Sequence, residues 1–222
     1  MTPNATVCSA WRLYVILDPA AARARDLADL AAAAIRGGAD VLQLRDKAAS
    51  DADLLAAARR VVPIAHGQGI PLIVNDRVHI ARDAGADGVH LGQEDVPLRV
   101  ARTLLGPAVI LGKSTHSLEQ ALAAQEEGAD YLGCGPVFAT PTKPDSPGVG
   151  LEPVTRVMSA VQVPVVCIGG IDERTLPAVL AAGARAVAVV RAVCSADDPE
   201  SAARGLADVL RQRSRATAAP SV

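Results

Sequence analysis

The sequence predicts a single α/β domain folded as a (β/α)8 barrel, in which eight parallel strands are each followed by a helix. Short runs of Val, Leu and Ile alternate with longer Ala-, Leu- and Arg-rich stretches of helical period, the pattern of βα units around a parallel sheet. A Gly-Ala-Asp motif recurs at Gly38, Gly85 and Gly128, and Gly-Ala-Arg follows at Gly183. Four units of two βα elements make a barrel, for which 222 residues is near the lower end of the usual size. An open doubly wound sheet is the structural alternative.

The predicted strands are short and apolar. Several odd-numbered strands begin after a proline, as at Pro71, Pro107 and Pro164, whereas each even-numbered strand follows one of the glycine motifs. Glycine lets the chain turn sharply after a helix, and Ala lets the next strand start close to it. The eight strands are expected at Leu13–Leu17, Val41–Arg45, Leu72–Asn75, Gly88–Leu91, Val109–Ser114, Tyr131–Cys134, Val165–Ile168 and Ala186–Val190.

The helices between them are expected from apolar residues at helical spacing. Ser50, Ser117 and either Asp198 or Pro199 are suitable helix starts. Residues 1–12 are predicted to be an N-terminal extension, 13–212 the barrel, and 213–222 a frayed tail. The expected helices are Arg25–Arg36, Asp51–His66, Val78–Ala84, Pro97–Leu105, Leu118–Glu127, Pro153–Ala160, Leu176–Ala182 and Glu200–Arg213.

The composition excludes several classes of protein. Lys plus Arg number 22 and Asp plus Glu 24, for a net charge of −2, and aromatic residues make up only 2%. A basic, aromatic-lined groove for nucleic acid is therefore not expected. No apolar run approaches the roughly 20 residues of a membrane helix, and the N-terminus lacks a secretory pattern, so we expect a soluble, cytoplasmic protein. The cysteines are isolated in sequence, which indicates structural thiols: Cys8, Cys134, Cys167 and Cys194.

Polar residues stand where the second strand ends. Side chains alternate along a strand, so Gln43, Arg45 and Lys47 share one face while Leu42 and Leu44 share the other. Arg and Lys at the mouth of a barrel would form an anion site. The alternative is a structural ion pair between Arg45 and a neighbouring aspartate.

Two carboxylates follow the next two strands. Asn75 shares a face with Ile73, Asp76 follows it, and Asp95 lies in the loop after the fourth strand. Mg²⁺ commonly takes one or two carboxylates together with water and phosphate oxygens, so the pair beside the basic residues predicts a metal-bridged diphosphate. The alternatives are helix capping by Asp76 and stabilisation of a helix dipole by Asp95. His90 is expected to be a packed, hydrogen-bonded barrel histidine.

The fifth strand and the long loop from Gly135 to Gly150 add further candidates. Alternation turns Ser114 inward and Lys113 the other way. The loop is rich in proline and glycine, and long βα loops in compact barrels are usually functional; its alternative is an incidental mobile loop. All three lysines of the chain fall at strand ends, which predicts a functional placement: Lys47, Lys113 and Lys143.

The last two βα loops contain Gly169-Gly170 and Val190-Arg191. Barrels often bind phosphate at these loops through backbone N–H groups. A tight strand-to-helix turn is the alternative explanation of the glycine pair.

Six segments, taken in order, resemble the thiamine-phosphate synthase family over about Leu13 to Ala203. They are Gln43-Leu44-Arg45-Asp46-Lys47, Asn75-Asp76, His90 to Asp95, Gly112 to His116, Thr140 to Lys143, and Gly169-Gly170-Ile171. The resemblance implies a triosephosphate-isomerase-type (TIM) barrel and a transferase. Its reaction would join 4-amino-2-methyl-5-hydroxymethylpyrimidine diphosphate to a thiazole phosphate, or its carboxylated form, releasing diphosphate.

The resemblance also implies residue roles. Asp76 and Asp95 would bind Mg²⁺. The thiazole phosphate would lie on Thr140, Pro141, Thr142, Gly170, Val190 and Arg191. The pyrimidine diphosphate would be held by Gln43, Leu44, Arg45, Asp46, Lys47, Asn75, Ser114 and Lys143, of which Arg45, Lys47, Ser114 and Lys143 are the catalytic candidates. Similar proteins usually have Ser where Arg191 stands.

The implied chemistry suits these residues. The attacking thiazole nitrogen has no proton to lose, so the step needs stabilisation of the departing diphosphate rather than a general base. Two rival functions remain: a thiazole tautomerase, and a non-enzymatic paralogue that only binds thiamine precursors. The expected partners are small molecules, with no nucleic acid and no membrane, and a homo-oligomer is left open.

Overall fold

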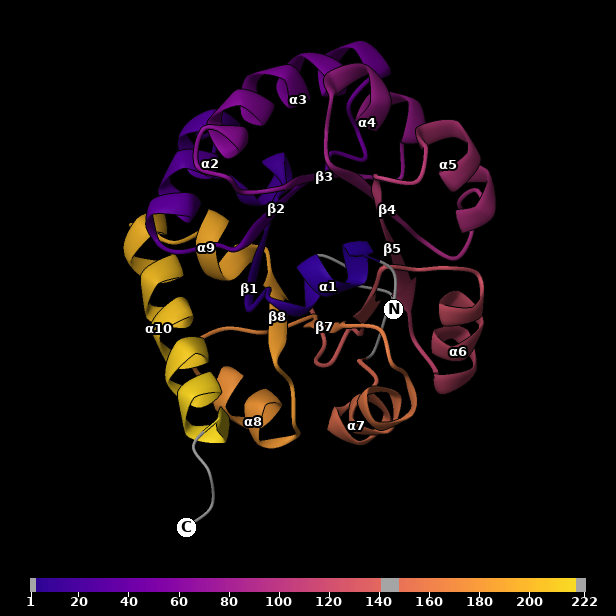
Figure 1. Cartoon of the computed structure of the whole chain (residues 1–222). Coiled ribbons are helices and arrows are strands. Elements are labelled where there is room, and N and C mark those ends of the chain that lie inside the picture. The colour runs from indigo at the N-terminus through magenta and orange to yellow at the C-terminus, as the bar shows by residue number, and fades with distance from the viewer. Residues whose placement is uncertain (1–2, 141–147, 219–222) are drawn as a thin grey trace.

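Eight parallel strands close into a barrel in sequence order, each paired with its chain neighbours and β8 with β1 (Figure 1). The structure, a computed structural model, describes residues 3–140 and 148–218. The closed barrel confirms the predicted TIM barrel and excludes an open sheet. The strands are β1 (Leu13–Leu17), β2 (Val41–Leu44), β3 (Leu72–Asn75), β4 (Gly88–Leu91), β5 (Ile110–Thr115), β6 (Tyr131–Cys134), β7 (Val165–Ile168) and β8 (Ala186–Val189).

Helices surround the barrel (Figure 1). Those over its sides are α2 (Leu27–Arg36), α3 (Asp51–His66), α4 (Val78–Ala84), α5 (Leu98–Leu105), α6 (Leu118–Glu126), α7 (Leu151–Ala160), α8 (Leu176–Ala181) and α10 (Pro199–Ala218). Each of these helices begins within two residues of the start predicted from the sequence. α10 continues past Arg213, where the sequence predicts a frayed tail, and ends at Ala218. No helix among the described residues is long and apolar enough to cross a membrane.

Three short helices are not predicted from the sequence: α1 (Pro3–Ser9), η1 (Pro19–Ala21) and α9 (Arg191–Cys194). Each is too short to show an apolar period. α1 lies in the predicted N-terminal extension and covers the end of the barrel where the strands begin. Cys8 and Trp11 pack inside the barrel, and the Asn4 amide donates to the Val109 carbonyl at 3.1 Å. The opposite end of the barrel remains open for a site.

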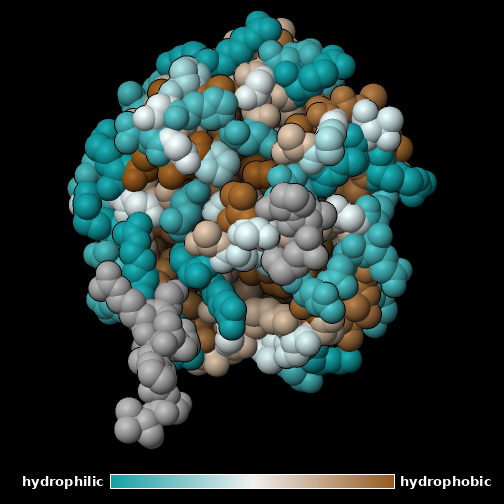
Figure 2. All heavy atoms as spheres, viewed as in Figure 1, coloured by the Kyte–Doolittle hydropathy of each residue, from teal (hydrophilic) through white to brown (hydrophobic). Residues whose placement is uncertain are grey.

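The core has two layers. One lies between the strands and the helices and includes Leu42 and Leu44; the other fills the barrel interior around Tyr14, Ile73 and Tyr131. The alternation predicted for the second strand is thus confirmed. Figure 2 shows hydrophilic residues spread over the outer helices, with hydrophobic ones gathered near the centre and on the side of α5.

The repeated glycine motif ends four helices in the same way. Gly38, Gly85, Gly128 and Gly183 have φ of 98°, 69°, 94° and 101°, in the left-handed region that costs glycine little. The amide of the following alanine then bonds back to the last helical turn, as from Ala39 to Ala34 at 3.0 Å, the pattern of a Schellman motif.

The aspartate of the motif ties neighbouring strands together. Asp40 accepts from the Leu13 amide at 2.9 Å, Asp87 from Leu72 at 2.8 Å and Asp130 from Leu111 at 2.9 Å. Each carboxylate therefore holds the first residues of the preceding odd-numbered strand. Arg185 stands at the fourth position and cannot accept a hydrogen bond, so β7 starts without this tie.

Candidate active site

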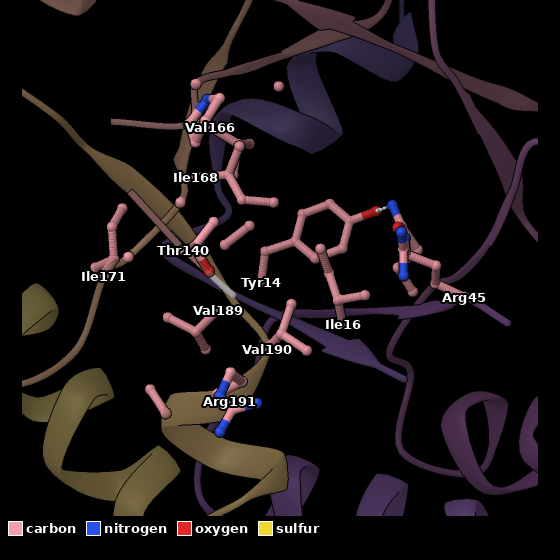
Figure 3. A pocket seen from close by; sticks show the side chains of 18 of the residues that line it. Tyr14, Ile16, Arg45, Thr140, Val166, Ile168, Ile171, Val189, Val190 and Arg191 are labelled. Atoms are coloured by element: carbon pink, nitrogen blue, oxygen red, sulfur yellow. Dashed lines mark hydrogen bonds between the residues drawn. The ribbon is translucent and has the colours of Figure 1, made fainter. Parts of the chain in front are cut away.

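A cavity of about 710 Å³ opens at the carboxyl ends of the strands. This volume lies within the range of small-molecule sites, roughly 300–1,000 Å³. Figure 3 shows Tyr14 at its centre, Arg45 on one side, and Thr140, Val189 and Val190 on the other, with Arg191 beyond them. The cavity brings together ten sequence-predicted residues: Gln43, Arg45, Lys47, Asn75, Asp76, Ser114, Thr140, Gly170, Val190 and Arg191.

Among the candidates that the structure describes, Leu44, Asp46 and Asp95 do not line this cavity. The Leu44 side chain packs in the outer core layer, so only its backbone faces the mouth of the barrel. Asp46 accepts from the amides of Ala48 and Ala49, both at 3.0 Å, which gives its carboxylate a turn-forming role. Pro141, Thr142 and Lys143 lie outside the described residues.

Arg45 forms an ion pair with Asp18, as the structural alternative predicts, and it also lines the cavity. The ion-pair interpretation is therefore confirmed, and the anion-site interpretation stays a prediction that the position of Arg45 permits. Asp18 is only 4% exposed, and its other oxygen caps η1 by accepting from the Ala20 amide at 2.9 Å. The sequence reasoning missed Asp18, although its place directly after the first strand was a usable signal.

Asp76 occupies a strained position between a cation and a second carboxylate. Its φ is 62°, which is uncommon for a residue other than glycine and typical of functional sites. Lys47 Nζ lies 3.4 Å from Asp76 Oδ2. Burial, followed by the neighbouring Asp95, raises the pKa of the Asp76 carboxyl. Lys47 partly offsets this effect.

The two structural alternatives, helix capping by Asp76 and helix-dipole stabilisation by Asp95, are both wrong. Arg77 is the N-cap of α4, which has no side-chain cap hydrogen bond. α5 begins at Leu98 and has no acidic residue in its first turn. Asp95 instead accepts from the Gly92 amide at 2.6 Å, which fixes one of its oxygens within the β4–α5 loop.

The donor set suits a cation that brings other ligands with it. Within residues 3–140 and 148–218, no group of three or more His, Cys, Asp and Glu side chains could hold a metal. Asp76 and Asp95 supply two carboxylates, and Mg²⁺ typically takes one or two together with water and phosphate oxygens. The pair therefore fits Mg²⁺ shared with a bound phosphate better than a closed protein cage.

Lys113 lies away from the cavity, contrary to the functional placement predicted for all three lysines. Its side chain turns away from Ser114, as alternation predicts. It is 6% exposed, and its Nζ donates to the Gly92 carbonyl at 2.8 Å. Lys113 thus holds the β4–α5 loop that carries Asp95, a supporting role that strand alternation alone could not reveal.

The inner wall carries a hydrogen-bonded histidine, as predicted. His90 Nε2 lies 2.9 Å from Ser114 Oγ, and Nδ1 lies 2.9 Å from the Tyr131 hydroxyl. Tyr14 and Tyr131 also line the cavity, and neither was among the site residues predicted from the sequence. Their position on the inward face of β1 and β6 was a usable signal.

The far side of the cavity is formed by the loops after β7 and β8. Gly170 has a φ of 63°, and a Cβ there would lie 2.7 Å from Phe138 Cβ, so glycine is needed for this close approach. Arg174 and Thr175 line the cavity as well. Arg174 was not predicted, and its 3.4 Å pairing with Asp172 is solvent-exposed. Arg191 begins α9 and adds a second cation on this side.

Comparisons with known proteins agree with this arrangement. Residues 13–193 match the family described as "Thiamine monophosphate synthase". The chain is 48% identical to the thiamine-phosphate synthase of Roseiflexus castenholzii, over 90% of this chain and 89% of that protein. It is 46% identical to that of Mycobacterium bovis, over 90% and 94%. Among solved structures, a thiamine phosphate pyrophosphorylase from Pyrococcus furiosus superposes with a TM-score of 0.85 at 34% identity, over 93% of this chain and 98% of that one.

Proposed function

Since the chain belongs to the thiamine-phosphate synthase family and is a transferase, we propose the reaction that it catalyses. It joins 4-amino-2-methyl-5-hydroxymethylpyrimidine diphosphate to 4-methyl-5-(2-phosphoethyl)thiazole, or the carboxylated thiazole. The products are thiamine phosphate and diphosphate, together with carbon dioxide where the thiazole is carboxylated. The observation that carries the proposal is that Arg45, Lys47 and Asp76 line one mouth of the cavity, with Asp95 next to Asp76.

The basic side of the mouth suits a diphosphate. Arg45 offers several N–H donors in a fixed plane, and Asp18 keeps its guanidinium in place. Lys47 is a mobile point charge that reaches Asp76. Asn75 lines the same wall and adds an amide. These donors would bind the oxygens of the diphosphate and orient its bond to the pyrimidine methylene.

The reaction is a substitution with a good leaving group. The methylene carbon–oxygen bond breaks, and its electron pair leaves with the diphosphate. The lone pair of the thiazole nitrogen then forms the new carbon–nitrogen bond, so no proton is transferred. Arg45 and Lys47 stabilise the charge that develops on the leaving oxygens, the type of contribution that usually dominates such catalysis. Mg²⁺ held by Asp76 and Asp95 would supply further charge neutralisation there.

The thiazole phosphate fits the other side of the cavity. Thr140, Gly170 and the Val190-Arg191 pair line it. Glycine lets a phosphate approach the backbone, and Arg191 supplies a charge. The apolar side chains of Ile168, Val189 and Val190 are suited to pack against the thiazole ring. The two substrates would therefore enter from opposite sides and meet above Tyr14.

The charged groups disfavour the two rivals. A tautomerase needs acid–base groups and no diphosphate site, whereas this cavity places its charges for binding an anion beside a cation. A non-enzymatic paralogue rests on Arg191 alone, and an arginine at this position can still bind phosphate.

The test is product formation by the purified protein. With both substrates and Mg²⁺, thiamine phosphate should be detected by mass spectrometry, and a chelator should abolish it. Arg45→Ala should reduce kcat/KM by about 100-fold or more, the usual cost of removing a donor to developing charge. Arg36→Ala is the matched control, because Arg36 is exposed and pairs with Glu200 on the outer helices. Product formation by Arg45→Ala at the wild-type rate would contradict the proposal.

A further inference from the structure

Five side chains form a continuous hydrogen-bonded chain across the barrel interior. Gln43 Nε2 donates to the Tyr14 hydroxyl at 2.8 Å. The Tyr14 and Tyr131 hydroxyls lie 2.9 Å apart. Tyr131 reaches His90 Nδ1 at 2.9 Å, and His90 Nε2 reaches Ser114 Oγ at 2.9 Å. Gln43 and Ser114, at the two ends of this hydrogen-bonded series, are therefore connected through side chains that form the floor of the cavity.

Two glycines in the strands leave room for these hydrogen-bonded side chains. A Cβ at Gly112 would lie 2.2 Å from the Tyr131 ring and 2.5 Å from His90 Nδ1. A Cβ at Gly133 would lie 3.1 Å from His90 Cε1. Two glycines on β5 and β6 thus leave the space that the histidine and tyrosine occupy. Tyr14 and Tyr131 are only 2% and 1% exposed.

The donors and acceptors fix one direction along the chain. An amide nitrogen can only donate, so the Tyr14 oxygen accepts from Gln43 and its proton passes to Tyr131. Tyr131 then donates to His90 Nδ1, which places the imidazole proton on Nε2, facing Ser114. The reverse direction would leave the Tyr14 proton against the amide nitrogen, a buried unpaired donor. Burial raises the pKa of both phenols, so both protons are retained.

The two ends of the hydrogen-bonded series present opposite groups to the cavity, a donor at Ser114 and an acceptor at Gln43. Ser114 accepts from His90 and keeps its own proton free to donate to a ligand. Gln43 donates from Nε2 to Tyr14 and keeps Oε1 as an acceptor. Among the described residues, every side-chain nitrogen or oxygen that is buried from solvent has a hydrogen-bond partner. Gln43 Oε1 has no such partner, so it must be accessible, and Gln43 lines the cavity.

We propose that Tyr14, Tyr131 and His90 are positioning residues that impose this polarity, and that the polarity makes the site specific for an aminopyrimidine over an oxopyrimidine. An aminopyrimidine presents a ring-nitrogen acceptor to Ser114 and an amino donor to Gln43. An oxopyrimidine carries a ring N–H and a carbonyl, which reverses both contacts. The inference rests on the proposed pyrimidine substrate and adds the groups that select it.

The test compares two pyrimidine diphosphates, the 4-amino substrate and its 4-oxo analogue, through the ratio of their kcat/KM values. Tyr131→Phe removes the donor to His90 Nδ1 and frees the imidazole to place its proton on either nitrogen. Tyr14→Phe frees the Gln43 amide to rotate. Each variant should lower the amino-to-oxo ratio by about tenfold or more, the effect of relieving a mispaired buried hydrogen bond. Unchanged ratios in both folded variants would overturn the proposal.

Trp11→Phe is the matched packing control. The Trp11 ring contacts Tyr131 and Tyr14 edge-on, with centroids 5.1 Å and 5.8 Å away, but it does not belong to the chain of hydrogen bonds. This variant should lower thermal stability and leave the ratio within about twofold, the scatter expected for a site that keeps its hydrogen bonds. A ratio that falls as far as in Tyr131→Phe would assign the effect to packing and overturn the proposal.

A second readout does not depend on turnover. Nitrogen-15 NMR of the wild-type protein, with His90 assigned by comparison with His90→Gln, reports which ring nitrogen carries the proton. The expected result is a neutral ring protonated on Nε2; protonation on Nδ1 alone would overturn the proposed direction. If the wild type makes no thiamine phosphate, the proposed function fails, while the His90 tautomer still decides the direction of the chain.

Discussion

At Arg45, one guanidinium is shared between a buried aspartate and the open cavity. Asp18 is held by η1 and by Arg45 together. Its position therefore sets where the remaining N–H donors of Arg45 point. A rigid donor fork binds a phosphate more strongly than a mobile one, because less side-chain entropy is lost on binding.

Asp18→Asn tests this dependence. The amide oxygen can still accept from Ala20 and so preserve η1, but the charge opposite Arg45 is lost. We expect KM for the pyrimidine diphosphate to rise by about tenfold, the loss of one charge-assisted contact, with KM for the thiazole phosphate little changed. Steady-state kinetics with each substrate varied in turn measure both values. An equal rise in both KM values would contradict a specific role in holding Arg45.

Asp76 lowers the folding stability of the metal-free protein. Because its pKa is raised in the folded state, the native protein binds the proton more tightly than the unfolded chain. Stability thus falls as the pH rises from the unfolded pKa through the folded one. The destabilisation is fully present once the pH exceeds the folded-state pKa of Asp76. Asn also adopts a positive φ more readily than most residues.

Asp76→Asn should therefore raise Tm in chelator at pH 7 by about 2–4 °C, the shift that corresponds to roughly 1 kcal/mol in a domain of this size. The same variant should lose most synthase activity. Thermal unfolding with and without Mg²⁺ measures the effect, and the wild type should gain more from Mg²⁺ than the variant. Asp83→Asn, on an exposed residue paired with Arg82, serves as the control. A lower Tm for Asp76→Asn in chelator would refute the expectation.

The residue scale also shows what sequence can predict about a site. Alternation along a strand is local, so it places Gln43 and Ser114 inward without knowledge of other strands. Asp18, Tyr14 and Tyr131 escaped because their roles depend on partners from strands far away in sequence. Lys113 was misjudged for the same reason: the carbonyl that it holds belongs to the neighbouring strand's loop.

At the scale of elements, the Gly-Ala-Asp repeat links helix termination to strand registration. The glycine ends one helix, and the aspartate fixes the start of the preceding odd-numbered strand. Asp130 is fully buried and also pairs with Arg102 at 2.7 Å. The repeat made the strand positions predictable, whereas α9 and η1 were missed because a helix of one turn contains no period.

Asp130→Ala should lower the free energy of unfolding by about 2–4 kcal/mol, since it removes the acceptor of the Leu111 amide and the carboxylate partner of Arg102. Urea titration followed by circular dichroism measures this change. The kcat/KM of the folded fraction should stay near the wild-type value, because Asp130 lies at the far end of the barrel from the cavity. Asp197→Ala is the control, as Asp197 forms an exposed pair with Arg23 and should change stability by less than about 0.5 kcal/mol. Equal losses in the two variants would contradict the structural role of the repeat.

At the scale of the whole molecule, the two ends of the barrel have separate tasks. The carboxyl ends of the strands hold the charges, and the amino ends are closed by α1, with Trp11 buried beneath it at 3% exposure. Sequence periodicity predicted the barrel and the polar end correctly, because both depend on repeated local patterns. It did not predict α1 as a plug, since seven residues without an apolar period give no signal of where they pack.

Deleting residues 1–10 tests whether α1 closes the barrel. Trp11 is the only tryptophan of the chain, so its fluorescence reports on this end alone. The deletion exposes the apolar interior that Cys8 and its neighbours cover, so we expect a red-shifted emission. The free energy of unfolding should fall by about 25 cal/mol for each Å² of apolar surface returned to water, which lowers the urea midpoint. Val7→Ala, on the exposed face of α1, is the matched control and should leave both values unchanged. In the wild type, fluorescence and circular dichroism should give coincident transitions, as for a domain that unfolds in one step. An unchanged emission maximum after the deletion would show that α1 does not shield the barrel interior from water.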